Sequence, residues 1–308
     1  MQSPDLRNDK LCNNNVNNLS SDAISKEQDL DIIKQWLKQQ PHLPDEWDDA
    51  CLRSFLRNCS YSLEKTKRKL DMYFTMRAAC PEFFADRDIN RPELMDLMIR
   101  GQNPSMPGLT TEGRRISYSR GLHKNLETRQ LIEAFKILMM VSEVRMFEET
   151  EALTGDVYVF DIDIVSTGHL KKMISPTLIK KFLICAQEAY PLRIKEVHIV
   201  NVNPIIDLIL NIVKPFLKEK IRKRIILHKE CNGLLEYLPK DMVPLEYGGT
   251  GPSLVEIQAM WLKKLTEFTP WFKEQESIKA NEALRPGKPT NYDELFGIEG
   301  SFKQLTID

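Results

Sequence analysis

The sequence lacks the features that define several common classes of protein. Its 308 residues include 43 basic and 44 acidic side chains, for a formal net charge of −1. A chain so close to neutral has no overall field that attracts nucleic acid or a membrane, so a charged partner requires a local patch. Its longest apolar runs, such as residues 137–141, fall far short of the roughly 20 residues that a membrane-spanning helix needs. No apolar segment follows the first charged residues, so we expect no signal peptide and a cytoplasmic location.

The cysteines and histidines form no recognisable metal or disulfide pattern. No two cysteines make a C-x-x-C pair, and no His/Cys cluster has the spacing of a zinc site. Scattered thiols are typical of a reducing compartment, and we expect no metal and no cofactor. The six cysteines are Cys12, Cys51, Cys59, Cys80, Cys185 and Cys231.

The first 90 residues predict a short disordered tail followed by a helical domain. Residues 1–20 are polar and rich in asparagine, which leaves too little apolar surface to offset the entropy of ordering. Helical spacing of apolar residues then predicts helices at about 22–40, with Ile24, Leu30, Ile33 and Leu37 inward, and at 45–58 and 62–79. We therefore expect a disordered segment over 1–20 and a small helical domain over 21–90.

The remainder predicts an α/β domain. Apolar strand-like runs at 116–119, 156–161, 197–201 and 224–228 alternate with helical patterns at about 125–150, 176–190, 204–214 and 216–222. Such alternation favours a mainly parallel sheet, which we assign to residues 91–275. Ser253 and Glu256 form a capping box before a last long helix to about residue 283, and residues 276–308 are a C-terminal extension.

Two motifs resemble catalytic sites. The run at 157–165 ends an apolar strand with Asp161 and Asp163, as in phosphatases in which the first aspartate attacks phosphorus. The downstream acidic pair that would complete a magnesium site is missing, so a strand-end aspartate that caps the next turn is favoured. The glycines at 248–251 lack the lysine of a phosphate-binding loop, which favours a turn in which Tyr247 packs.

Residues 204–224 are the most informative segment. The helix at 205–213 is apolar on nearly every side, with Asp207, Asn211 and Lys214 in one narrow stripe. It is therefore either a core helix or a cover over an apolar cavity. Residues 214–230 carry seven basic and two acidic side chains, with Lys220 and Arg224 expected on one helical face. This charge indicates either a solvated face or a surface that meets an anionic membrane. Nucleic acid is less favoured, since no aromatic residues interleave.

Taken together, these segments resemble the CRAL-TRIO family of lipid-transfer proteins, most closely its tocopherol- and retinal-binding branch. The resemblance covers about residues 45–275. It rests on the blocks at 52–57, 77–82, 175–176, 190–193, 198–201, 214–220, 225–228 and 245–249.

The resemblance implies a carrier rather than an enzyme. It implies an α/β fold in which an apolar cavity holds one hydrophobic molecule, such as a tocopherol (vitamin E) or a retinoid, under a mobile lid helix at 205–216. It also implies lipid transport to membranes through a basic patch that binds phosphoinositides. The alternative is a phospholipid or phosphoinositide exchanger or sensor that acts through a protein partner.

The resemblance also assigns residues to two sites. One serine of the tocopherol-binding pocket falls on Leu138 here, which predicts a drier cavity. The expected pocket residues are Phe135, Ser142, Phe160, Phe182, Cys185, Leu192, Ile194, Ile206, Ile209, Leu210 and Val213. The expected phosphoinositide-binding residues are Arg68, Arg193, Lys195, Lys220 and Arg224, while a further basic position falls on Cys59.

Overall fold

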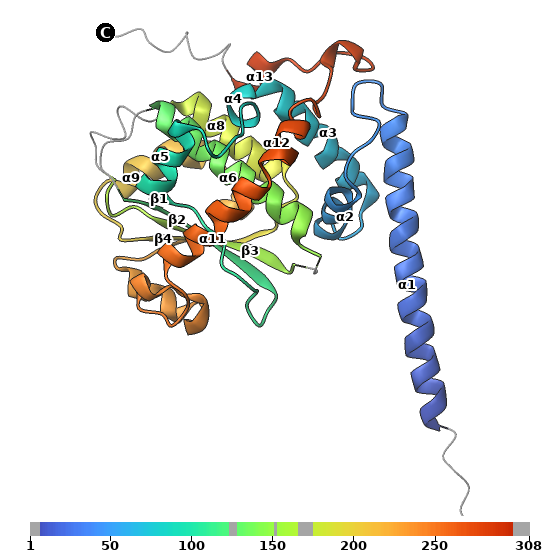
Figure 1. The fold of residues 1–308 in the computed structure, drawn as a ribbon, viewed down its shortest axis with the longest axis horizontal. Helices are drawn as coiled ribbons and strands as arrows, with labels where there is room; N and C mark the ends of the chain where they lie inside the picture. Colours follow the sequence, from blue (N-terminus) through green and yellow to red (C-terminus); the bar gives the residue numbers. More distant parts are fainter. Residues whose placement is uncertain (1–6, 123–127, 151–152, 166–174, 298–308) are drawn as a thin grey trace, which may run out of the picture.

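The structure, a computed structural model, describes residues 7–122, 128–150, 153–165 and 175–297 (Figure 1). The N-terminal region consists of helices α1 (Arg7–Lys38), α2 (Asp49–Asn58), α3 (Leu63–Ala79) and α4 (Pro81–Phe84). Leu30, Ile33 and Leu37 repeat every three to four residues along α1 and are fully buried, so this end of the helix packs against the body.

The N-terminal part of α1 departs from the expectation in two ways. The helix begins at Arg7, so residues 7–20 are helical where their composition predicts no structure, and this part projects away from the body (Figure 1). Ile24 is 58% exposed rather than inward. A helix that packing holds further along extends at little cost through polar residues, because the nucleation step has already been made.

The described strands form a five-stranded sheet in the order β1-β2-β3-β4-β5. Only the first pair is antiparallel; the other three pairs are parallel, which confirms the expected mainly parallel α/β fold. The strands are β1 (Gly101–Gln102), β2 (Arg114–Gly121), β3 (Gly155–Asp161), β4 (Ile194–Val200) and β5 (Ile225–Leu227). Helix α5 (Pro92–Arg100) precedes β1, and the helices between the strands are α6 (Thr128–Glu148), α8 (Pro176–Ile184), α9 (Ile206–Val213) and α10 (Glu219–Arg222).

Alternation along the strands divides the sheet into two faces. Ile116, Val157 and Val159 point to one face and join a core with Leu254 and Ile257 of helix α11 (Leu254–Glu267), which crosses the sheet in Figure 1. The residues between them point to the other face. The packed core and the alternating residues therefore lie on opposite faces of the sheet.

The C-terminal region differs from the expected single long helix. The predicted capping box at Ser253 and Glu256 is confirmed, but α11 ends at Glu267 and α12 (Thr269–Gln275) follows. Pro270 explains the break, because it lacks the N–H that would continue the α11 hydrogen-bond ladder. The shorter elements are η1 (Cys185–Ala189), η2 (Lys214–Phe216), η3 (Cys231–Glu236), η4 (Lys240–Met242), η5 (Leu245–Tyr247), η6 (Glu282–Leu284) and α13 (Tyr292–Phe296).

A buried charged cluster joins the N-terminal helices to the α/β domain. Glu143 of α6 accepts hydrogen bonds from Arg77 (2.7 Å) and from Tyr73 (2.8 Å), both on α3. It also accepts from Arg87 and from Tyr190, whose hydroxyl lies 2.9 Å away. One carboxylate therefore holds groups from several segments, which fixes α6 relative to the helical domain.

Candidate functional site

The floor of a cavity follows directly from the strand register. Tyr158 of β3 pairs with Ser117 of β2 and Val197 of β4, and two residues further along Phe160 pairs with Ser119 and Ile199. Paired residues share a face and successive pairs are two residues apart. The register therefore places two rows of side chains side by side on the sheet face opposite the packed core, and all of them line the cavity.

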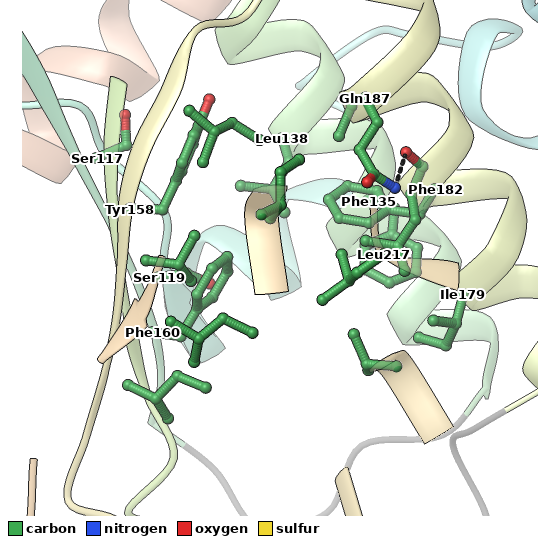
Figure 2. Close-up of a pocket in the computed structure, with 18 of the residues that line it drawn as sticks. Ser117, Ser119, Phe135, Leu138, Tyr158, Phe160, Ile179, Phe182, Gln187 and Leu217 are labelled. Atoms are coloured by element: carbon green, nitrogen blue, oxygen red, sulfur yellow. Dashed lines mark hydrogen bonds between the residues drawn. The ribbon is translucent and has the colours of Figure 1, made fainter. Parts of the chain in front are cut away.

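Three helices complete the enclosure. Leu138 of α6 and Phe182 of α8 line the walls, and Phe182 stacks on Phe135 at 4.1 Å between ring centroids. The covering helix α9 contributes Ile206, Ile209, Leu210 and Val213, a set spaced three to four residues apart that forms one helical stripe. The cavity has a volume of about 310 Å³. Figure 2 shows Leu138, Phe160 and Phe182 around it.

The α9 stripe borders both the cavity and a small apolar cluster. Its inward residues line the cavity, and Ile206 and Leu210 also pack in a small buried cluster with Ile162 and Ile199. Its other side is exposed: Asp207 and Asn211 face solvent, as does Leu208, which is 42% exposed. The helix therefore has an apolar side that faces the cavity and an exposed side, which carries one leucine as well as the polar residues.

All of the predicted pocket residues except Cys185 line this cavity. Cys185 is fully buried in the main core and lies against Cys80; burial raises the pKa of its thiol well above the ordinary value. The reason is helical spacing: Phe182 and Ala186 line the cavity, whereas Cys185 shares the opposite face with Leu178 of the main core. The roles of the other predicted residues as ligand contacts stay predictions.

Several lining residues were not predicted, among them Ser117, Ser119, Tyr158, Gln187 and Leu217 (Figure 2). Period-two alternation around Phe160 marks Tyr158 as its neighbour on the same face, so that signal was present in the sequence. The serine hydroxyls are already engaged: Ser119 donates to Asn103 (2.7 Å), and Ser117 shares a hydrogen bond with Ser105 (2.6 Å).

The lining is electrically neutral. Among the described residues that line the cavity, none is an aspartate, glutamate, lysine, arginine or histidine. Ser142 donates its hydroxyl to the main-chain oxygen of Leu138 at 2.8 Å, so this predicted polar contact is also largely satisfied internally. Burying an ion in such surroundings would be costly, so the cavity suits an uncharged, mainly apolar molecule.

The predicted phosphoinositide-binding residues fall into two groups. Arg68, Lys195 and Lys220 are exposed. Arg193 is half-buried and donates to the carbonyl oxygens of Asn58 (2.6 Å) and Arg57 (2.9 Å) at the C-terminal end of α2. Arg224 is also half-buried and donates to the carbonyl of Ile194. These two guanidinium groups hold main chain in place, which leaves fewer donors for a phosphate.

The expected shared helical face of Lys220 and Arg224 is wrong. Helix α10 ends at Arg222, and Arg224 lies beyond it beside the start of β5. Lys214, Lys220 and Arg222 are exposed and have no ion pair within the described part of the chain. The basic character of this surface therefore comes from the two turns that flank α10 and from α10 itself.

Asp161 makes the turn-capping contact that the sequence favours. Asp161 accepts from the main-chain N–H of Asp163 (3.0 Å), from Asn201 (2.9 Å) and from the hydroxyl of Tyr247 (3.0 Å). Its carboxylate thus caps the turn after β3. The expected turn at the glycines 248–251 follows η5, where Tyr247 is buried. Across the described residues, no three potential metal-binding side chains come together, and no helix is long and apolar enough to cross a bilayer.

Comparisons with known proteins agree with this architecture. Residues 100–249 match the CRAL/TRIO domain, and residues 22–94 match a family described as Pinta-like, UBA domain. The crystal structure of Sfh5 superposes with a TM-score of 0.54, covering 82% of this chain and 97% of that one at 16% sequence identity. At that identity the similarity shows the fold alone.

Sequence relatives are more informative. The alpha-tocopherol transfer protein-like protein of Homo sapiens is 33% identical over 221 residues, which cover 70% of this chain and 63% of that protein. Clavesin-1 of Mus musculus is 26% identical over 248 residues, covering 76% of this chain and 70% of that protein. The chain thus spans less than two thirds of the length of the tocopherol-transfer-like relatives.

Proposed function

Because the chain belongs to the CRAL-TRIO family, we propose that it is a non-enzymatic carrier of one neutral hydrophobic molecule. The observation that supports this most directly is the uncharged cavity of about 310 Å³ that α9 lines together with the sheet, α6 and α8. That volume is at the lower end of the roughly 300–1,000 Å³ of ligand pockets. A single-chain or ring-containing lipid of the tocopherol or retinoid type suits it.

The alternative, a phospholipid or phosphoinositide exchanger or sensor, is less well supported. A phosphate held inside would need cationic groups at the ligand, and the described lining residues carry none. Native mass spectrometry of the purified protein followed by lipid extraction tests both. A bound neutral isoprenoid supports the carrier, whereas a bound phospholipid refutes it in favour of the exchanger.

We define the lid as α9 together with η2. This lid opens at a membrane. In the closed form its cavity-facing stripe is buried against the cavity, and in the open form the stripe is buried in the bilayer instead. Adjacent residues of the lid make a matched test. Ile209 lines the cavity and Leu208 points to solvent, yet both are branched aliphatic residues on one helix.

We expect Ile209→Asp to weaken binding of a neutral lipid at least tenfold, because the carboxylate must be desolvated or must draw water into the cavity. Leu208→Asp should leave equilibrium affinity unchanged and slow transfer to vesicles. Ligand titration, stopped-flow transfer and circular dichroism melting separate these effects. Equal affinities of the two folded variants would remove α9 from the ligand site.

The basic surface around α10 (Lys214, Lys220 and Arg222), together with Lys195, is proposed to deliver the carrier to anionic membranes that contain phosphoinositides. It is accordingly a cytoplasmic protein with transient peripheral membrane association. Lys195 and Lys220 are the appropriate residues to change, because their ammonium groups are exposed, whereas Arg193 and Arg224 support main chain.

Lys195→Gln with Lys220→Gln keeps most of each side-chain stem and removes two charges. Each is worth about 1 kcal/mol near an anionic surface, so transfer to phosphoinositide vesicles should slow about 10- to 30-fold. Lys263→Gln with Lys273→Gln, an equal charge loss on α11 and α12, is the control. The basic surface has no such role if both double variants transfer lipid at the same rate at low salt.

A further inference from the structure

One side chain ties the wall of the cavity to the end of the lid. Gln187 lies in the π-helical turn η1, and its side chain lines the cavity (Figure 2). Its amide nitrogen donates to the carbonyl of Leu183 within its own helix (3.1 Å) and to the carbonyl of Phe216 (3.0 Å). Its amide oxygen accepts the main-chain N–H of Lys218 at 2.8 Å.

These contacts hold the chain on both sides of one residue. Leu217, between the two bonded residues, is 9% exposed and lines the cavity itself. An amide is planar, with its donor and acceptor fixed relative to each other, so it makes both bonds only when residues 216–218 lie in the closed position. The ion pair of Lys218 with Glu188 adds a second tie between the same two segments.

The N-terminal helices anchor the η1 segment. Lys69 of α3 donates from its ammonium group to the main-chain oxygens of Gln187 (3.2 Å) and Tyr190. The wall to which the lid is tied is therefore held by the helical domain.

The other end of the lid has a main-chain bond before it, from the N–H of Val202 to the carbonyl of His228 (3.1 Å), but its side-chain bonds are long. Before α9 begins, the side chain of Asn203 donates to the carbonyls of Ile162 and Val165 at 3.4 and 3.5 Å. Bonds of this length lie beyond the usual range of 2.7–3.2 Å, whereas the bonds of Gln187 to the other end lie within it. The two ends of the lid are thus unequally fastened.

We propose that Gln187 is a latch that fixes the C-terminal end of the lid, so that the lid opens at its Ile206 end and pivots about residues 216–218. This inference rests on the proposed function, in which α9 moves to admit and release a lipid. Gln187 is a positioning residue in this scheme: it sets the path and the rate of opening and contributes little to equilibrium affinity for the ligand.

The test uses the full chain and Gln187→Met, which keeps the length of the side chain and removes both hydrogen-bonding groups. Gln187→Glu is a second variant that keeps the acceptor for Lys218 and loses the donor to Phe216. Gln258→Met is the matched control. The Gln258 amide also binds main chain, at Gly101 (3.1 Å) and Asn103 (3.1 Å), but lies away from the lid.

Two measurements are made. The first is hydrogen exchange of the Lys218 amide without ligand, which we expect to be at least tenfold faster in Gln187→Met, intermediate in Gln187→Glu and unchanged in Gln258→Met. The second is the release rate of a neutral, fluorophore-labelled long-chain alcohol, expected to rise several-fold in Gln187→Met while its equilibrium affinity changes less than twofold.

The outcomes separate the two proposals. If the wild type binds the alcohol but Lys218 exchange and alcohol release in Gln187→Met equal those of wild type, the latch is refuted and the carrier function stands. If the exchange results are as expected but the wild type binds no neutral lipid, the latch stands as a feature of the fold and the carrier function is refuted. If affinity falls as steeply as release rises, Gln187 is a ligand contact and the latch is refuted.

Discussion

The substitution Glu143→Gln should destabilise the protein severely although it changes no volume. Glu143 and its partners Arg77 and Arg87 are almost wholly inaccessible, with side-chain exposures of 0–1%. The carboxylate is the acidic group that both arginines contact. Removing its charge leaves two buried guanidinium groups whose remaining partners are main-chain carbonyls of Gln275, Ile278 and Phe272 and the hydroxyl of Tyr73.

The magnitude follows from the cost of breaking a buried ion pair. Leaving a buried charge without its partner costs about 3–5 kcal/mol, and one amide oxygen cannot replace both carboxylate oxygens as acceptors. A domain of ordinary stability has a free energy of unfolding of about 5–15 kcal/mol. For a protein in the middle of that range, at about 10 kcal/mol, the substitution would remove roughly a third to a half of the stability. The hydroxyl of Tyr190 also loses a charged acceptor, which loosens the end of the η1 turn.

The pH dependence gives the prediction a second, independent signature. Burial alone would raise the pKa of Glu143, but the charges of Arg87 and Arg77 outweigh it and lower the pKa below the ordinary value. A carboxyl whose pKa is lowered on folding stabilises the protein above the unfolded pKa of about 4.3 and loses that contribution as pH falls through the folded pKa. The stability difference between wild type and Glu143→Gln should therefore be full at pH 7 and shrink only below about pH 4.

Urea unfolding followed by circular dichroism at several pH values makes the measurement. Glu93→Gln is the control, because Glu93 contacts Arg91 and Arg129 at the surface and its loss should cost less than about 1 kcal/mol. A loss below about 1 kcal/mol in Glu143→Gln at pH 7 would show that the cluster is not held by charge pairing and would refute the reasoning.

Two further predictions concern buried polar groups near the cavity. The Tyr158 hydroxyl is buried with no hydrogen-bond partner among the described residues, so Tyr158→Phe should leave the free energy of unfolding unchanged or raise it by up to about 1 kcal/mol; a loss of more than about 1 kcal/mol in urea unfolding would reveal a partner. Burial lowers the pKa of Lys69 to about 8, so the folded state holds the ammonium proton less tightly than the unfolded chain does. Relative to Lys69→Met, the wild type should therefore gain about 2 kcal/mol of stability as pH rises from about 8 to about 10, and parallel pH profiles of the two proteins would contradict this assignment.

Much of the fold was predictable because it follows from local patterns. The helical spacing of Leu30, Ile33 and Leu37, and the alternation of helices with apolar strands, predicted the helical region and the parallel sheet. The three- and four-residue spacing of Ile206, Ile209, Leu210 and Val213 likewise assigns them to one helical face. Such patterns can be recognised in a sequence because the residues that share one face of a helix or strand recur at a regular spacing, about 3.6 residues in a helix and 2 in a strand.

The role of individual polar residues was harder to predict. Arg193 and Arg224 look like surface charges in the sequence, and both donate to carbonyls in the structure. Cys185 was expected in the pocket, but it lies on the opposite face of its helix and is buried in the core. Lys220, on the short helix α10, is exposed as a surface charge should be.

The sequence by itself determined where the chain becomes helix or strand and which faces are apolar, since these depend on residues within a few positions of one another. The tertiary structure alone decided that an uncharged cavity remains between the sheet and α9, and which buried polar groups meet. Gln187 binds main chain about 30 residues away, and Glu143 collects side chains from up to 70 residues away. A main-chain donor or acceptor is present at nearly every residue, so no sequence pattern marks the one that a distant side chain will bind.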